Sequence, residues 1–132
     1  MGFSAASVIS PQELHQNQRE FFVLDVREVT EFEDEGHIKG ATNAFVGDLA
    51  RVVDDLPKDK PIVVTCSVGH RGSLALSILL RAGRKSCYNL LGGMKAWNAL
   101  GLPVSKKKAD SFYYTLKESV PRPIDETISK GH

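Results

Sequence analysis

The sequence predicts an α/β domain in which a mainly parallel, five-stranded sheet is covered by helices on both faces. Short apolar runs of strand length alternate with segments of helical periodicity, and the connections between them are short. At 132 residues, the chain has the length of one compact domain with its own core. In sheets of this kind, binding sites lie beyond the carboxyl ends of the strands.

The first strand is expected at residues 7–9, directly before a helix. Ser10 can cap that helix, and Glu13 stands at the spacing of a capping box. The run "FFVLDV" at 21–26 is almost entirely apolar, which is typical of a strand that is covered on both faces.

A second capping box is expected at Thr30 and Glu33, and it would open a short acidic helix. Gly36 is placed to end this helix. The turn that follows leads into a third strand at 42–45. These elements keep the alternation of strands and helices.

The middle of the chain continues the pattern with a helix and a buried strand. Four apolar residues follow the spacing of one helix face: Leu49, Val52, Val53 and Leu56. Pro57 is expected to stop this helix, and "PIVVT" at 61–65 reads as the next strand.

The last elements are a helix at 73–83, a strand at 86–90 and a helix between Gly92 and Gly101. The segment "SLALSILLRAG" at 73–83 is apolar nearly all round, which predicts a helix packed deeply against the sheet. The final helix is expected to bury one side, made of Met94, Trp97 and Leu100.

The character of the chain changes after residue 104. Residues 105–132 are charged, interrupted by proline and weakly periodic. We therefore expect a main domain at 1–104 and a C-terminal appendage at 105–132, partly ordered or disordered, in which "SFYYTL" is a candidate for an added strand.

Composition excludes several classes of function. The chain is 42% hydrophobic, with 17 basic and 16 acidic side chains, so no nucleic-acid partner is expected. Its apolar runs are too short to span a membrane, and the N-terminus lacks the pattern of a secretory signal, which predicts a cytoplasmic protein. The two cysteines suit neither a disulfide scaffold nor a zinc site, so no metal is expected.

The loop "TCSVGHRGS" at 65–73 is the candidate site. A strand, a loop of small residues and a helix direct backbone N–H groups and a helix dipole at one point, which favours an anion there. Cys66 stands at that point, and we expect its thiolate to be the resting form. Gly69 and Gly72 let the loop backbone curl around that point without side chains filling the space, and Arg71 adds a permanent positive charge. The alternative is a buried cysteine before an ordinary glycine turn.

Three segments then identify a family. They are "VLDVREVTEFEDEGHIKGA" at 23–41, "VVTCSVGHRG" at 63–72 and "NLLGGMKAW" at 89–97. In this order they resemble the single-domain rhodaneses, which are thiosulfate or persulfide sulfurtransferases. The resemblance covers about residues 7–104 and implies the rhodanese-like three-layer fold.

The resemblance implies that Cys66 is the catalytic nucleophile. It would take sulfur from a small anionic donor, thiosulfate or a low-molecular-weight persulfide, and pass it to a thiol or to cyanide, with no cofactor. A protein sulfur acceptor is the alternative partner; the chain would then be a sulfur-relay or binding module, with the appendage as its docking element. A cysteine phosphatase or arsenate reductase is disfavoured, because four residues separate Cys66 from Arg71 where phosphatases have five.

Seven residues are predicted to bind the substrate: Ser67, Val68, Gly69, His70, Arg71, Gly72 and Arg27. Ser67 would act through its backbone N–H or through its hydroxyl. His70 would attract an anion or simply face solvent. Arg71 would contact donor oxygens or fix loop carbonyls.

Other residues of the family segments are assigned structural roles. Internal pairing is expected for Asp25, Arg27, Glu31 and His37, although Arg27 is also a candidate to border the pocket. Gly92, Gly93 and Trp97 fit a tight turn and a core anchor. Cys87 is expected to be an inert core thiol, with a resolving partner for Cys66 as the alternative.

Overall fold

A computed structural model describes residues 7–107 and confirms the predicted fold class. The central sheet has the order β1-β6-β5-β2-β4, and every neighbouring pair is parallel. Its strands are β1 (Val8–Ile9), β2 (Phe22–Asp25), β4 (Thr42–Asn43), β5 (Ile62–Thr65) and β6 (Cys87–Leu90).

A small antiparallel ladder lies beside the main sheet. It pairs β3 (His37–Ile38) with β7 (Val104–Ser105), so β7 crosses the boundary predicted at residue 104. The rest of the predicted appendage, from 108 onward and including "SFYYTL", lies outside the described residues. The division into a domain and an appendage stays a prediction.

The sheet separates two hydrophobic cores. In β2, Val23 and Leu24 belong to different cores, and in β5 the same holds for Val63 and Val64. Successive side chains of a strand point to opposite faces, so apolar residues at consecutive positions require cover on both sides. This confirms the buried-strand reading of both runs.

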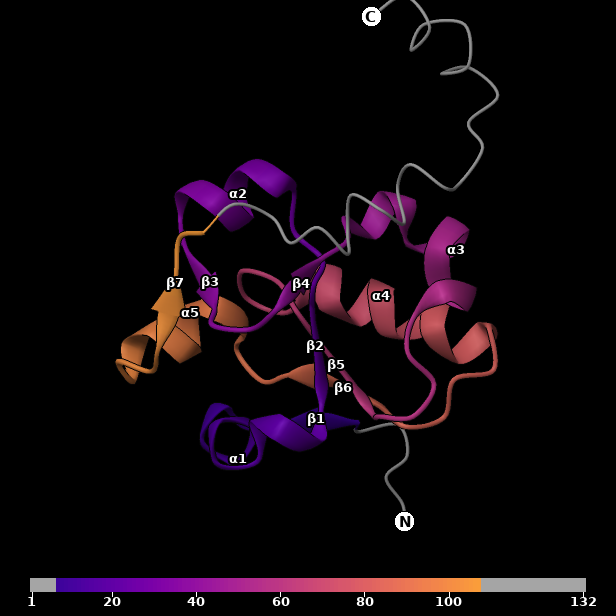
Figure 1. Cartoon of the computed structure of the whole chain (residues 1–132), viewed down its shortest axis with the longest axis horizontal. Helices are drawn as coiled ribbons and strands as arrows, with labels where there is room; N and C mark the ends of the chain where they lie inside the picture. The colour runs from indigo at the N-terminus through magenta and orange to yellow at the C-terminus, as the bar shows by residue number, and fades with distance from the viewer. Residues whose placement is uncertain (1–6, 108–132) are drawn as a thin grey trace, which may run out of the picture.

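Helices form the two outer layers. They are α1 (Pro11–Gln16), α2 (Val29–Asp34), α3 (Leu49–Val52), α4 (His70–Arg81) and α5 (Gly93–Ala99), with short 3-10 turns at Gln18–Glu20, Val46–Asp48 and Val53–Asp55. Figure 1 shows α3 and α4 on one side of the sheet, and α1 and α5 on the other. Within residues 7–107, no helix is both long and apolar enough to cross a membrane.

One of the two predicted helix starts is correct. Ser10 caps α1, and its hydroxyl accepts the N–H of Glu13 at 3.1 Å. The second was placed wrongly at Thr30: α2 begins after Glu28, which forms a reciprocal capping box with Glu31. Glu31 also binds Arg71 of α4, and this long-range contact cannot be read from the local sequence around α2.

Three helix predictions need correction. The segment 49–56 is not one helix, because α3 ends at Val52 and a 3-10 turn follows. Only one stripe of α4 is buried, and Leu74 and Leu80 are 55% and 49% exposed. Leu100, expected in the core, is 48% exposed beyond the end of α5. A helix on an outer layer buries only the side that faces the sheet, whatever its composition.

Candidate active site

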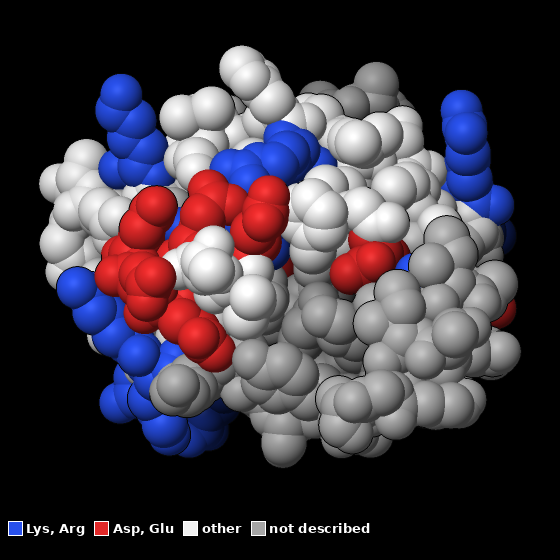
Figure 2. Space-filling model, turned by 90° about the horizontal axis from the view of Figure 1, so that it is seen from above, with Lys and Arg blue, Asp and Glu red and all other residues white. Residues whose placement is uncertain are grey.

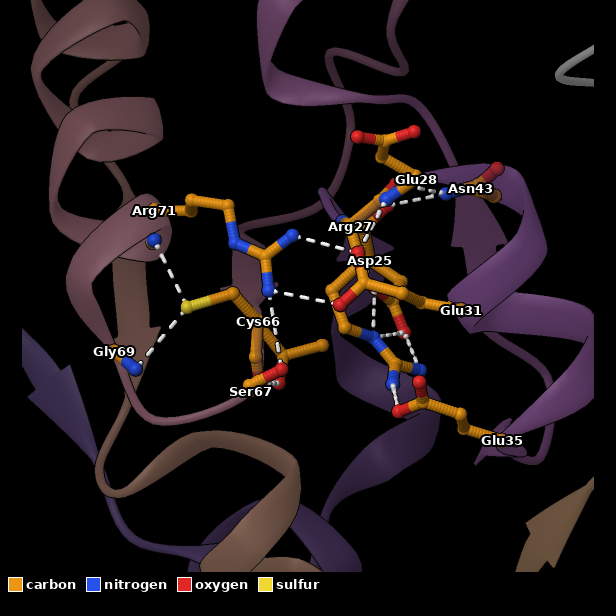
Figure 3. A network of polar contacts seen from close by, with 12 residues as sticks. Asp25, Arg27, Glu28, Glu31, Glu35, Asn43, Cys66, Ser67, Gly69 and Arg71 are labelled. Atoms are coloured by element: carbon orange, nitrogen blue, oxygen red, sulfur yellow. Dashed lines mark hydrogen bonds and ion pairs between the residues drawn. The ribbon is translucent and has the colours of Figure 1, made fainter.

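The site lies where two neighbouring strands end. Asp25 at the end of β2 is in register with Thr65 at the end of β5. The loop that begins at Cys66 and the loop that follows β2 therefore leave the sheet side by side (Figure 3). This is the edge at which parallel sheets place their binding sites.

Two backbone N–H groups are directed at the sulfur of Cys66. Gly69 donates to Sγ at 3.1 Å, as Figure 3 shows, and Gly72 donates to it at 3.2 Å. Gly69 has φ +127°, a backbone conformation that favours glycine, and α4 begins directly after it at His70. The sulfur thus lies at the positive end of a 12-residue helix. This is the backbone cradle that the loop sequence predicts, and Cys66 lies at its base, only 1% exposed.

The cradle is supported from behind by the start of α5. Met94 N–H donates to the carbonyl of Cys66 at 2.7 Å, and Lys95 N–H donates to that of Ser67 at 2.9 Å. Gly93 comes so close that a Cβ atom there would lie 2.5 Å from the oxygen of Cys66. The prediction of a structural role for Gly93 is confirmed. Because it has no side chain, the start of α5 can lie against the backbone of Cys66 and Ser67.

Arg71 binds two side chains of the protein, and its predicted contact with donor oxygens stays a prediction. Its guanidinium donates to both carboxylate oxygens of Glu31, at 2.7 and 3.1 Å, and to Ser67 Oγ at 3.0 Å. The hydrogen bonds that Arg71 donates to Glu31, with the negative charge of Glu31, raise the pKa of Arg71, and the same hydrogen bonds lower the pKa of Glu31. Glu31 therefore has the internal pairing that the sequence predicts, but its partner lies in the candidate loop at 65–73.

Arg27 and His37 have the internal contacts that the sequence predicts. Arg27 is 2% exposed and binds the carboxylate of Asp25 and, at 2.8 Å, the carbonyl of Gly36. Burial works to lower the pKa of Arg27, but the hydrogen bond and charge of Asp25 outweigh it and raise the pKa. His37 stacks on Phe32. A direct contact of Arg27 with a sulfur donor stays a prediction.

The remaining loop side chains differ in exposure. Val68 is 46% exposed, and His70 is exposed at the first position of α4. Ser67 is partly buried, with its hydroxyl bonded to Arg71. These positions fit a backbone role for Ser67 and Val68 and a solvent-facing His70; substrate contacts by all three stay predictions.

Asn89 is a site residue that the sequence analysis missed. Its side-chain amide donates to the carbonyl of Gly69 at 3.2 Å and to Ser73 Oγ at 3.3 Å. Its Oδ1 would lie 2.2 Å from a Cβ at Gly72. Asn89 thus binds Gly69 and lies close against Gly72, the two glycines whose N–H groups face the sulfur. The available signal was an amide side chain within an otherwise buried strand.

Cys87 lies far from Cys66. It pairs with Ile62 at the start of β5, whereas Cys66 follows the end of that strand, so roughly 13 Å of strand separates the two levels. Burial raises the pKa of the Cys87 thiol, against the opposing charge of Arg84. The core-thiol prediction is confirmed. Among residues 7–107, no cluster of three or more His, Cys, Asp or Glu is placed to hold a metal ion.

Comparisons with known proteins agree on one family. The family model described as "Rhodanese-like domain" matches residues 10–100. The thiosulfate sulfurtransferase GlpE of Coxiella burnetii is 30% identical over 82 residues, which are 62% of this chain and 76% of that protein.

Two further matches extend this result. The putative sulfur carrier protein YrkF of Bacillus subtilis is 31% identical over 75 residues, 57% of this chain but only 40% of that protein. Among solved structures, a rhodanese-related protein from Thermoplasma volcanium is 30% identical with a TM-score of 0.71, covering 76% of this chain and 98% of that one.

Proposed function

Since this chain belongs to the rhodanese-like domain family, we propose that it is a sulfurtransferase that works through a persulfide on Cys66. It takes a sulfane sulfur from thiosulfate or a low-molecular-weight persulfide and passes it to a thiophilic acceptor, with cyanide as the acceptor in vitro. The observation that carries the proposal is the pair of N–H groups, from Gly69 and Gly72, that donate to Sγ.

The first half-reaction loads a sulfur atom onto the enzyme. The Cys66 thiolate attacks the outer sulfur of thiosulfate, a new S–S bond forms to Sγ, the old S–S bond breaks, and sulfite leaves with the bonding electron pair. With an organic persulfide, the leaving group is the corresponding thiolate. Backbone N–H groups favour the attacking thiolate and the persulfide anion that replaces it, because both carry negative charge at the centre of the cradle.

The second half-reaction transfers the sulfur from the enzyme to the acceptor. An acceptor attacks the terminal sulfur of the Cys66 persulfide, and the thiolate of Cys66 is released; cyanide gives thiocyanate. Two half-reactions on one sulfur need no metal or organic cofactor, because the sulfur moves without a net change in the oxidation state of the enzyme. A cytoplasmic location, where thiols remain reduced, suits this chemistry.

A second candidate is a sulfur relay in which the acceptor is a protein. The similarity to the putative sulfur carrier YrkF favours it. In this case Cys66 would still accept sulfur, but turnover with cyanide would be slow, and a persulfide would accumulate on the enzyme. The rate of the second half-reaction therefore separates the two candidates.

Mass spectrometry tests both candidates. Treatment with thiosulfate or glutathione persulfide should add about 32 Da, one sulfur atom, at Cys66 and not at Cys87. Cys66→Ser should abolish both this adduct and thiocyanate formation. Full thiocyanate production by that variant would refute the proposal, and hydrolysis of a phosphate ester would favour a phosphatase instead.

A further inference from the structure

The arginine of the Cys66 loop, Arg71, is already paired. Arg71 points both terminal nitrogens at the carboxylate of Glu31, and one of them also binds Ser67 (Figure 3). The pair is only partly exposed, 33% for Arg71 and 24% for Glu31, so water screens it incompletely. An arriving anion thus meets a guanidinium whose charge is paired and which already uses three of its five N–H donors.

The other charged side chains of this network do not restore a positive field. Arg27 pairs with Asp25 at 2.8 Å and lies 3.8 Å from Glu35. The guanidinium groups of Arg27 and Arg71 are thus each paired with a carboxylate that is buried or partly buried, that of Asp25 and that of Glu31, whereas Glu35 is 64% exposed and water screens its charge. On the face seen in Figure 2, most of the acidic side chains gather in one area, and others lie apart from it.

Two further basic residues belong to the segments that form the cradle. His70 and Lys95 are both exposed, so solvent and salt screen their charges. The attraction for an anion comes mainly from backbone dipoles, which act at short range on the reacting sulfur. They do not offset two full charges on the leaving group.

We infer that Glu31 determines donor specificity: by neutralising Arg71, it favours sulfur donors whose leaving group carries one negative charge at the released sulfur, the class of organic persulfides, over thiosulfate, whose leaving group is the sulfite dianion. This inference rests on the proposed function, because it concerns the first half-reaction. Glu31 acts through Arg71 and is a positioning residue.

A pair of donors isolates the effect of charge. Thiosulfate carries two negative charges, and methanethiosulfonate, in which a methyl group replaces one oxygen, carries one. Both present the same outer sulfur to the Cys66 thiolate; one S–S bond forms and one breaks, with sulfite or methanesulfinate leaving with the electron pair. Glutathione persulfide serves as the third donor and releases glutathione thiolate.

The variant Glu31→Gln removes the charge while keeping the shape. The amide oxygen of glutamine can still accept from Arg71 and from the N–H of Glu28, which Glu31 now binds at 3.0 Å, whereas the amide nitrogen cannot accept the second bond from Arg71, now at 3.1 Å. We expect kcat/KM to rise for both test donors, chiefly through a lower KM. Coulomb energy scales with the product of the charges, so the gain for the dianion is twice that for the monoanion: a threefold rise with methanethiosulfonate corresponds to a roughly tenfold rise with thiosulfate.

Two control variants complete the test. Asp34→Asn removes one charge from an exposed position of the same helix, and should leave the ratio of the two donors within about twofold of the parent protein. Glu31→Asp keeps the charge and should keep the preference for the monoanion. Thermal unfolding of each variant checks that it is folded.

The outcomes separate this inference from the proposed function. If the parent protein takes sulfur from none of the three donors, the proposed function fails. If it accepts sulfur, but Glu31→Gln changes both test donors by the same factor or lowers the rate with thiosulfate, the function stands and the specificity role of Glu31 is wrong. A larger rise in kcat/KM for thiosulfate than for methanethiosulfonate in Glu31→Gln supports the inference.

Discussion

Gly93→Ala should damage the active-site loop from behind, without touching the substrate. The Cβ of the alanine would meet the carbonyl oxygens of Cys66 and Ser67 at 2.5 and 2.6 Å. Ordinary contact begins at about 3.4 Å, so the two segments must separate by about 0.9 Å. Both contacts are to backbone, which cannot rotate away as a side chain can.

The cost of that separation follows from the contacts it breaks. Two hydrogen bonds, at 2.7 and 2.9 Å, join the start of α5 to the cradle, and they contribute about 1 kcal/mol each. Gly93 has φ +58°, where an alanine costs a further 1 to 2 kcal/mol, roughly. We expect a loss of about 3 kcal/mol in the free energy of unfolding and, because a misplacement of about 1 Å is large for catalysis, a fall of about 100-fold in kcat/KM.

The chain supplies a matched control at Gly101. Its φ is +67°, close to that of Gly93, but a Cβ there would meet nothing within 4 Å. Gly101→Ala therefore carries the backbone strain without the collision, and should lose about 1 to 2 kcal/mol in the free energy of unfolding and little activity. Thermal unfolding and the thiosulfate–cyanide assay measure both variants. Equal activity in folded Gly93→Ala and Gly101→Ala would refute the reasoning.

Three more predictions concern other parts of the site. Asn89→Ala should lower kcat/KM by about tenfold, with a small loss of thermal stability, because it frees the cradle carbonyl it now holds; unchanged kinetics would contradict this role. The Glu31 carboxylate, whose pKa Arg71 lowers, contributes stability above its ordinary pKa of about 4.3 and loses it as pH falls. In urea unfolding, the free energy of unfolding of the parent should exceed that of Glu31→Gln by less than about 1 kcal/mol at pH 7, and this difference should shrink by pH 3. A difference that grows as the pH falls would contradict the expected pH dependence. Cys87→Ala should keep the rate of sulfur transfer within about twofold and leave the sulfur adduct on Cys66. Loss of that adduct would instead indicate that Cys87 is the resolving partner of Cys66.

Local patterns were reliable where one element determines its own structure. Consecutive apolar residues in β2 and β5 require cover on both faces, so the layered sheet follows from the sequence. They were less reliable where the environment decides, as at the start of α2, where Glu28 and not Thr30 is the cap. The apolar side chains of α4 likewise could not reveal that Leu74 faces outward.

The sequence by itself determined the order of the elements, the position of Cys66 at a strand end, and the glycines that let N–H groups surround its sulfur, because these depend on residues that are neighbours in the chain. Only the tertiary structure decided that Glu31 pairs with Arg71, 40 residues away, and that Asn89 holds Gly69, 20 residues away. Such contacts depend on strand register and on how loops meet at one edge of the sheet, and no local pattern contains either.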